Sequence, residues 1–123
     1  MTSKTKSISY TLSVSSAQKQ IREAEDLYIL AKSLLETYLC SDKPVKYRDD
    51  AVKLLIDYSY NSRMYGETLV GFIETGKRIQ NEKTGKESIV VDLTGFSLIN
   101  AYVAVMANCE NELETLGISM RIH

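Results

Sequence analysis

The sequence predicts a mainly α-helical protein, an antiparallel bundle of three long helices. Two observations support this prediction. Apolar residues recur at alternating spacings of four and three over two long stretches, which places them on one face of a helix. A third stretch, residues 96–107, is polar only at Ser97 and Asn100, and it is too short to cross a bilayer, which needs about 20 apolar residues. The three helices are expected near residues 15–40, 46–80 and 94–116.

Length and composition favour one domain. The chain has 123 residues, of which 44% are hydrophobic and 25% charged, enough for one modest core. We therefore predict a single helical domain over residues 1–123 with a flexible N-terminal tail at 1–6. The formal net charge is −1, so no overall field draws the protein toward nucleic acid or an acidic membrane.

An extended segment is predicted ahead of the first helix. Polar and apolar residues alternate over 7–14, which is typical of a half-buried strand. Ser15 is the expected N-cap of the helix, because Gln18 occupies the capping-box position. Ala24 and Ala31 on its apolar face would let another helix approach closely. Three leucines widen that face: Leu27, Leu30 and Leu34.

The second helix should begin after Pro44, because proline interrupts a helix interior. The short connection before it predicts that the first two helices are antiparallel neighbours. Gly66 and Gly71 lie within this helix and each costs about 1 kcal/mol relative to alanine. They therefore mark a bend or the close approach of another backbone.

The segment between the second and third helices has two interpretations. In the first, which we favour, the second helix reaches about Asn81 and is followed by a loop and a short strand at 88–92. In the other, residues 78–80 form the first leg of a β-hairpin.

Thr94, or as an alternative Asp92, should cap the third helix, and Gly117 should end it. Apolar side chains cover most of the circumference of its first half, so we expect that half to be enclosed by protein. Residues 118–122 alternate again and form a further candidate extended segment at the opposite end of the bundle.

Three helices supply too few neighbours to enclose such a helix, so we predict a homodimer or higher oligomer. The candidate interface consists of the large apolar residues of the third helix: Leu98, Tyr102, Val103, Val105 and Met106.

Residues suited to catalysis are sparse. The single histidine is His123, the last residue. Residues 71–78 match a phosphate loop only superficially, because Arg78 replaces the hydroxyl residue and the stretch follows a helix rather than a strand. Cys40 and Cys109 lack the spacing of zinc ligands and are expected to be free thiols. We predict no enzymatic activity, no metal and no cofactor.

A less favoured hypothesis is nucleic-acid binding by a face that combines basic residues with tyrosines, which supply phosphate contacts and stacking. Acidic neighbours reduce the net charge of this face. Its candidate residues are Lys46, Arg48, Tyr60, Arg63, Lys77 and Arg78.

The favoured function is a non-enzymatic protein–protein interaction or assembly module acting as a homo-oligomer: an adaptor, a small chaperone, an inhibitor or a structural subunit. A heterologous protein is a further partner that this class admits. The N-terminus lacks the apolar run of a secretory signal, so we expect a cytoplasmic protein without membrane association.

Overall fold

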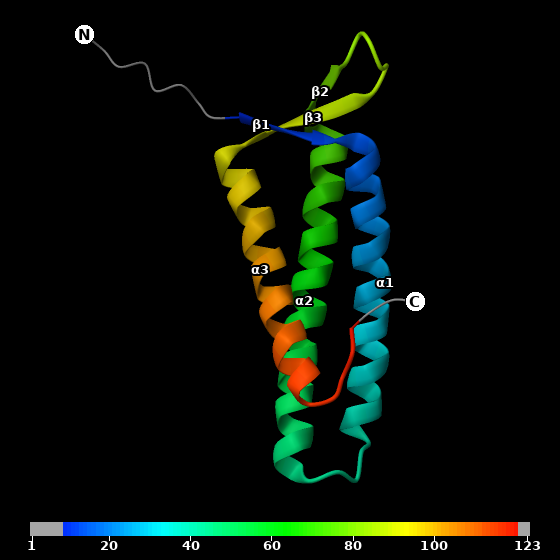
Figure 1. The fold of residues 1–123 in the computed structure, drawn as a ribbon, viewed down its shortest axis with the longest axis vertical. Helices are drawn as coiled ribbons and strands as arrows, with labels where there is room; N and C mark the ends of the chain where they lie inside the picture. The colour runs from blue at the N-terminus through cyan, green and yellow to red at the C-terminus, as the bar shows by residue number, and fades with distance from the viewer. Residues whose placement is uncertain (1–8, 121–123) are drawn as a thin grey trace, which may run out of the picture.

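The computed structural model describes residues 9–120. The tail expected at 1–6, the first two residues of the segment expected at 7–14, and residues 121–123 lie outside the described residues. The chain order is β1 (Ser9–Ser13), α1 (Val14–Leu39), α2 (Val45–Thr75), β2 (Lys77–Gln80), β3 (Glu87–Asp92) and α3 (Leu93–Thr115). The predicted class, a helical bundle with short extended segments, is confirmed (Figure 1).

The first two helices form an antiparallel hairpin and are the most extensively packed pair of helices among the described residues. Ala17, Ala24 and Ala31 of α1 are buried. A Cβ built on Gly66 would lie 3.5 Å from the Cβ of Ala24, and the Ser62 hydroxyl donates a hydrogen bond of 2.6 Å to the Ala24 carbonyl. The predicted close approach is therefore present at Gly66. α1 begins at Val14, two residues earlier than an N-cap at Ser15 would give, because the Ser13 hydroxyl accepts from the Ser16 amide and caps the helix in place of Ser15.

The favoured interpretation of residues 77–80 is wrong, because α2 ends at Thr75 and these residues form strand β2 of a hairpin. The chain leaves the helix at Gly76, where a Cβ would lie 2.4 Å from Ile89 Cγ2 and from the Phe72 carbonyl oxygen. The Arg78 guanidinium then donates to the Ile73 carbonyl at 3.2 Å and pairs with Glu87 at 3.0 Å. These contacts join the helix end to both strands.

The strands form an antiparallel sheet in the order β1-β3-β2, which lies across one end of the bundle (Figure 1). Tyr10 pairs with Val91 and Leu12 with Ile89, so these side chains share a face. Ile89 and Val91 are buried, and Tyr10 stacks on Phe96 of α3 with 4.1 Å between ring centroids. This face of the sheet therefore covers the end of the helical core.

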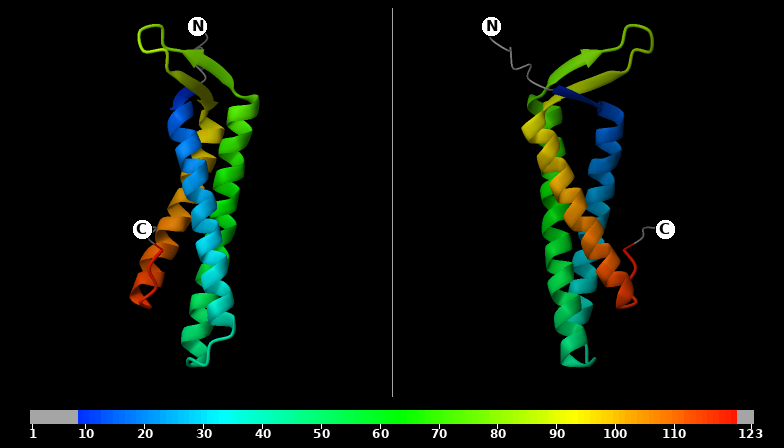
Figure 2. Two further views of the ribbon diagram at one scale, coloured as in Figure 1. Left: turned by 90° about the vertical axis from the view of Figure 1, so that its right-hand side faces the viewer. Right: turned by 60° about the vertical axis from the view of Figure 1, so that its left-hand side comes forward.

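The expectation that the first half of the third helix is enclosed is wrong for the single chain. Within 96–107 only Ile99 and Met106 are buried. α3 packs on α2 and crosses the α1–α2 helix pair obliquely (Figure 2). No Cα atom of α3 lies within 8 Å of a Cα atom of α1. Its N-cap is Asp92 rather than Thr94, since Asp92 Oδ1 accepts from the Gly95 amide at 2.7 Å.

The chain turns back after α3 and adds to the core. Gly117 has φ +80°, and the Ile118 amide donates to the Leu113 carbonyl at 2.9 Å. Ile118 and Met120 are buried against Leu35 and its neighbours on α1. The described part of the segment expected at 118–122 is therefore a packed tail and not a strand.

Candidate interaction surface

A groove opens between α1 and α3, with α2 beneath it. α1 and α3 stand apart, and the chain after α3 turns back across the lower part of the gap between them (Figures 1 and 2). Tyr65 of α2 forms part of the groove lining. The groove has a volume of about 310 Å³. It is lined by apolar residues, Ala24, Leu27, Val103, Met106 and Ala107, and by polar ones, Gln20, Glu23, Tyr65 and Glu110.

Two tyrosines of α2 fasten the helices that border this groove. The Tyr65 hydroxyl donates to Gln20 of α1, and the Tyr58 hydroxyl donates to Glu110 of α3 at 2.8 Å. Burial raises the pKa of Tyr65, and the nearby Glu23 carboxylate adds to this rise. Burial and the Glu110 carboxylate raise the pKa of Tyr58 strongly. Both hydroxyls stay protonated near neutral pH, so they act as hydrogen-bond donors between helices.

The structure divides the five candidate interface residues. Met106 is 7% exposed and belongs to the core, and Tyr102 is half-buried. Val103, 43% exposed, lines the groove. Leu98 and Val105, seven residues apart and therefore on one helix face, are exposed on the other flank of α3. The candidate interface thus consists of two separate apolar flanks.

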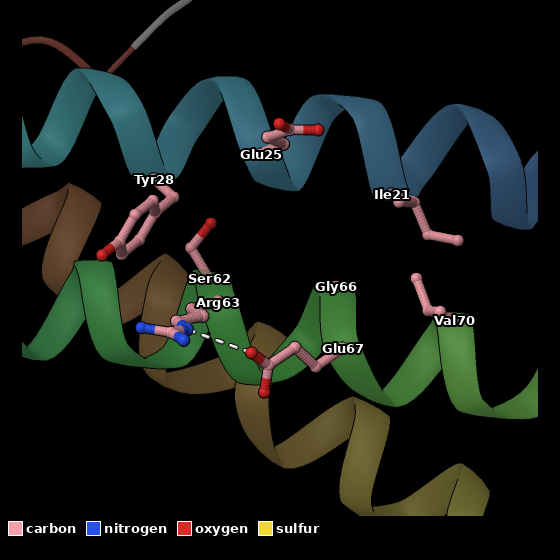
Figure 3. Close-up of a pocket in the computed structure, with 8 residues that line it drawn as sticks. All are labelled: Ile21, Glu25, Tyr28, Ser62, Arg63, Gly66, Glu67 and Val70. Atoms are coloured by element: carbon pink, nitrogen blue, oxygen red, sulfur yellow. Dashed lines mark hydrogen bonds and ion pairs between the residues drawn. The ribbon is translucent and has the colours of Figure 1, made fainter.

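A second groove of about 320 Å³ lies between α1 and α2 (Figure 3). Ile21 and Val70 approach each other at one end, and Tyr28 lies at the other. Arg63 and Glu67 form an ion pair of 3.0 Å at its edge. Gly66 belongs to the lining of this groove and also faces Ala24 across the helix contact.

The candidate nucleic-acid residues are spread over the length of the molecule. Lys46 and Arg48 lie in the first turn of α2, whereas Lys77 and Arg78 lie in β2 beyond its other end. The 31 residues of α2 span about 45 Å. Arg63 lies between the two groups.

The three arginines of this set are already engaged. Arg48 lies 3.9 Å from Asp49 and also donates to the Ser41 carbonyl, while Arg63 and Arg78 each pair with a glutamate at 3.0 Å. Tyr60 is 60% exposed, but the neighbouring tyrosines of α2 point into the protein, including Tyr47, whose hydroxyl donates to the Leu116 carbonyl. This arrangement does not favour a nucleic-acid interface.

Cys40 and Cys109 are free thiols, as expected from their spacing. Cys40 is exposed, whereas Cys109 is buried, and its burial raises the pKa of the thiol. Within residues 9–120 no group of three or more His, Cys, Asp or Glu side chains is placed to hold a metal ion. None of the helices in that range is long and apolar enough to cross a membrane.

Sequence reasoning missed the contribution of α1 and Tyr65 to the groove. One signal was present, because Leu27 belongs to the leucines that make the apolar face of α1 wider than a single neighbour requires. The oblique path of α3, which borders the groove, is evident only in the tertiary structure (Figure 2).

In comparisons with known proteins, the chain matches no family model, no curated protein and no solved structure.

Proposed function

We propose that this chain is a non-enzymatic assembly subunit that associates with a second copy of itself through the groove side of α3. The groove side consists of Leu27 on α1, Tyr65 on α2, and Val103 and Ala107 on α3. A second copy is the partner proposed because three helices leave this side of α3 without a neighbour, and a self-complementary contact supplies one.

The composition and exposure of α3 carry this proposal. No charged residue occurs from Leu93 to Cys109, although surface helices normally carry charge on their exposed face. Four large apolar side chains in this stretch are 38–47% exposed in the single chain: Leu93, Leu98, Val103 and Val105. Of these four, Val103 lines the groove together with Leu27 and Ala107, and exposed apolar surface of this kind is typical of protein interfaces.

The polar groups around the groove support a structural role. Tyr58 and Tyr65 donate hydrogen bonds to neighbouring helices, and the raised pKa of each hydroxyl opposes service as a base or nucleophile near neutral pH. A cytoplasmic location, which we also propose, is consistent with the exposed free thiol of Cys40.

Sedimentation equilibrium of the full chain, with light scattering as a second measure of mass, tests this proposal. The wild type is expected to be a dimer or higher oligomer at micromolar concentration. Val103→Asp should leave the monomer folded, because the side chain is 43% exposed, yet weaken association by more than about tenfold, because the contact would bury a carboxylate. Val105→Asp, the same substitution at a 38% exposed valine on the other flank of α3, is the matched control and should associate as the wild type does.

A monomeric wild type at these concentrations would contradict the proposal. Loss of association in Leu98→Asp together with normal association in Val103→Asp would also contradict it, since the contact would then use the opposite flank of α3. Purification as a stoichiometric complex with a different protein, and no self-association, would instead indicate an adaptor.

A further inference from the structure

The two outer edges of the sheet differ in how they are protected. Charged residues on an edge strand oppose pairing with another chain. β2 carries Lys77 and Arg78 and leads into a charged turn. β1 has no charged residue, proline or glycine, and among residues 9–120 no strand pairs with its outer edge. The unprotected edge of this sheet is therefore β1.

The sequence of β1 is symmetric in its polarity. Ser-Tyr-Thr-Leu-Ser reads polar, apolar, polar, apolar, polar from either end, with Thr11 at the centre. The register with β3 places Tyr10 and Leu12 on the face that covers the helices, and Thr11 beside Val90 on the outer face. A strand with this pattern can pair antiparallel with its own copy and keep every apolar residue on the helix-facing side.

We infer that β1 pairs with β1 of a second copy about a two-fold axis at Thr11, so that the two sheets become one continuous sheet. Tyr10 of one copy then lies opposite Leu12 of the other, an aromatic–aliphatic cross-strand pair, and the outward amide and carbonyl groups of both edges gain partners. This inference rests on the proposed self-association, and it identifies the β1–β1 contact as the one that fixes the two-fold symmetry of the dimer.

The position of β1 agrees with the proposed groove contact. β2, which follows α2, forms one edge of the sheet, and β1 forms the other edge, between the first turns of α1 and α3 (Figure 1). α1 and α3 are the helices that border the groove. Because β1 is antiparallel to its copy, the pairing turns the groove side of one chain toward that of the other. One two-fold axis therefore serves both the sheet edge and the exposed Val103 flank.

Cysteine cross-linking tests the register. In the full chain with Cys40→Ser, Thr11→Cys places two thiols on the two-fold axis, with Cα atoms about 4.5–5.5 Å apart, within the range for a disulfide. Mild oxidation should convert most of this variant into a reducible covalent dimer. Lys77→Cys in the same background, on the opposite edge of the sheet, is the matched control and should stay largely uncrosslinked.

The outcomes separate this inference from the proposed function. A wild type that self-associates, with Thr11→Cys cross-linking no more than Lys77→Cys, overturns the β1 pairing and leaves self-association in place. A monomeric wild type overturns both.

A charge substitution provides a second test that needs no disulfide. Thr11→Lys opposes two ammonium groups at the axis, and the exposed position leaves the single chain unchanged. Its dimer dissociation constant should rise by about tenfold or more, whereas Thr11→Val should retain the wild-type value. Equal dissociation constants for Thr11→Lys and the wild type would overturn the pairing.

Discussion

The hydroxyl of Tyr58 shows how single side chains hold this bundle together. The ring is fully buried, and its hydroxyl donates to Glu110 at 2.8 Å, which joins α2 to α3. A hydrogen bond to a charged acceptor contributes about 1.5–3 kcal/mol, and removal of the donor leaves the carboxylate with one partner fewer. Tyr65 makes the corresponding bond to Gln20 of α1. α2 is therefore linked to both of its neighbours by tyrosines.

Tyr58→Phe should lower the free energy of unfolding by about 1.5–3 kcal/mol at pH 8, because the bond to Glu110 is lost. The pKa of Tyr58 is raised in the folded state, so the unfolded chain loses the proton first. The stabilisation is thus complete below about pH 10 and declines above it by up to about 1.4 kcal/mol per pH unit. Denaturant unfolding from pH 8 to 11.5 should show the two proteins converging.

The same measurements at one protein concentration apply to Tyr60→Phe, which changes a side chain that is 60% exposed. Its free energy of unfolding at pH 8 should stay within about 0.5 kcal/mol of the wild type. A constant difference between Tyr58→Phe and the wild type across the alkaline range would show that the hydroxyl titrates alike in the folded and unfolded chains.

The residue pattern predicted the buried positions of the helices more accurately than it predicted their N-caps. The buried positions Ala24 and Ala31 follow directly from the spacing of apolar residues on α1. The N-cap is Ser13 rather than Ser15, although both are serines and both can cap a helix. Pairing of Ser13 with Ser88 at the end of the strand decides between them, and that pairing is a tertiary contact.

The glycines of α2 differ in their effect on this element. Gly76 ends the helix under the sheet, where a side chain would contact Ile89 and Phe72 at 2.4 Å. Gly71 lies in the helix with nothing within 4 Å of a built Cβ, so neither a bend nor a close approach requires glycine there. The predicted close approach therefore holds for Gly66 and not for Gly71.

Gly71→Ala should stabilise the protein by about 0.5–1 kcal/mol, because alanine restricts the unfolded chain and meets no neighbour in the helix. Gly76→Ala should destabilise it by about 1–3 kcal/mol, because the new methyl group clashes with a buried side chain and a backbone oxygen. Thermal and chemical unfolding of the pair measure both effects. Equal changes of one sign in the two variants would contradict this assignment.

The β2–β3 hairpin could not be separated from a longer α2 by pattern alone. Residues 77–80 contain one large apolar side chain, Ile79, which fits the surface of either a helix or a strand. The choice is made by contacts distant in sequence, namely Arg78 with Glu87 and Gly76 with Ile89.

At the scale of the whole molecule, the tail after α3 covers part of the core that the three helices leave open. Ile118 is 4% exposed and shares a core with Leu113 and Leu35, so the tail closes the lower part of the space between α1 and α3. The upper part stays open as the groove. The tail therefore fills one end of the space between α1 and α3, and the groove occupies another part of it.

Ile118→Ala should lower the free energy of unfolding by about 2–5 kcal/mol, because it leaves a cavity under the tail. Ile79→Ala is the matched control, since its side chain is 47% exposed, and it should cost less than about 1 kcal/mol. Chemical denaturation at fixed protein concentration compares the two. Equal losses would show that the tail adds no more to stability than an exposed strand residue.

The sequence by itself determined the three helices, the pairing of α1 with α2 and the strands β1 and β3, because apolar periodicity, Pro44 and the small residues act locally. Only the tertiary structure decided that the β2–β3 hairpin takes the place of the predicted end of α2, and that the tail after α3 folds onto the core. It also decided that α3 crosses the α1–α2 pair obliquely and leaves Val103 exposed. These features arise from contacts between residues far apart in the chain, and periodicity, which reports which side of a helix is apolar, does not report which neighbour covers it.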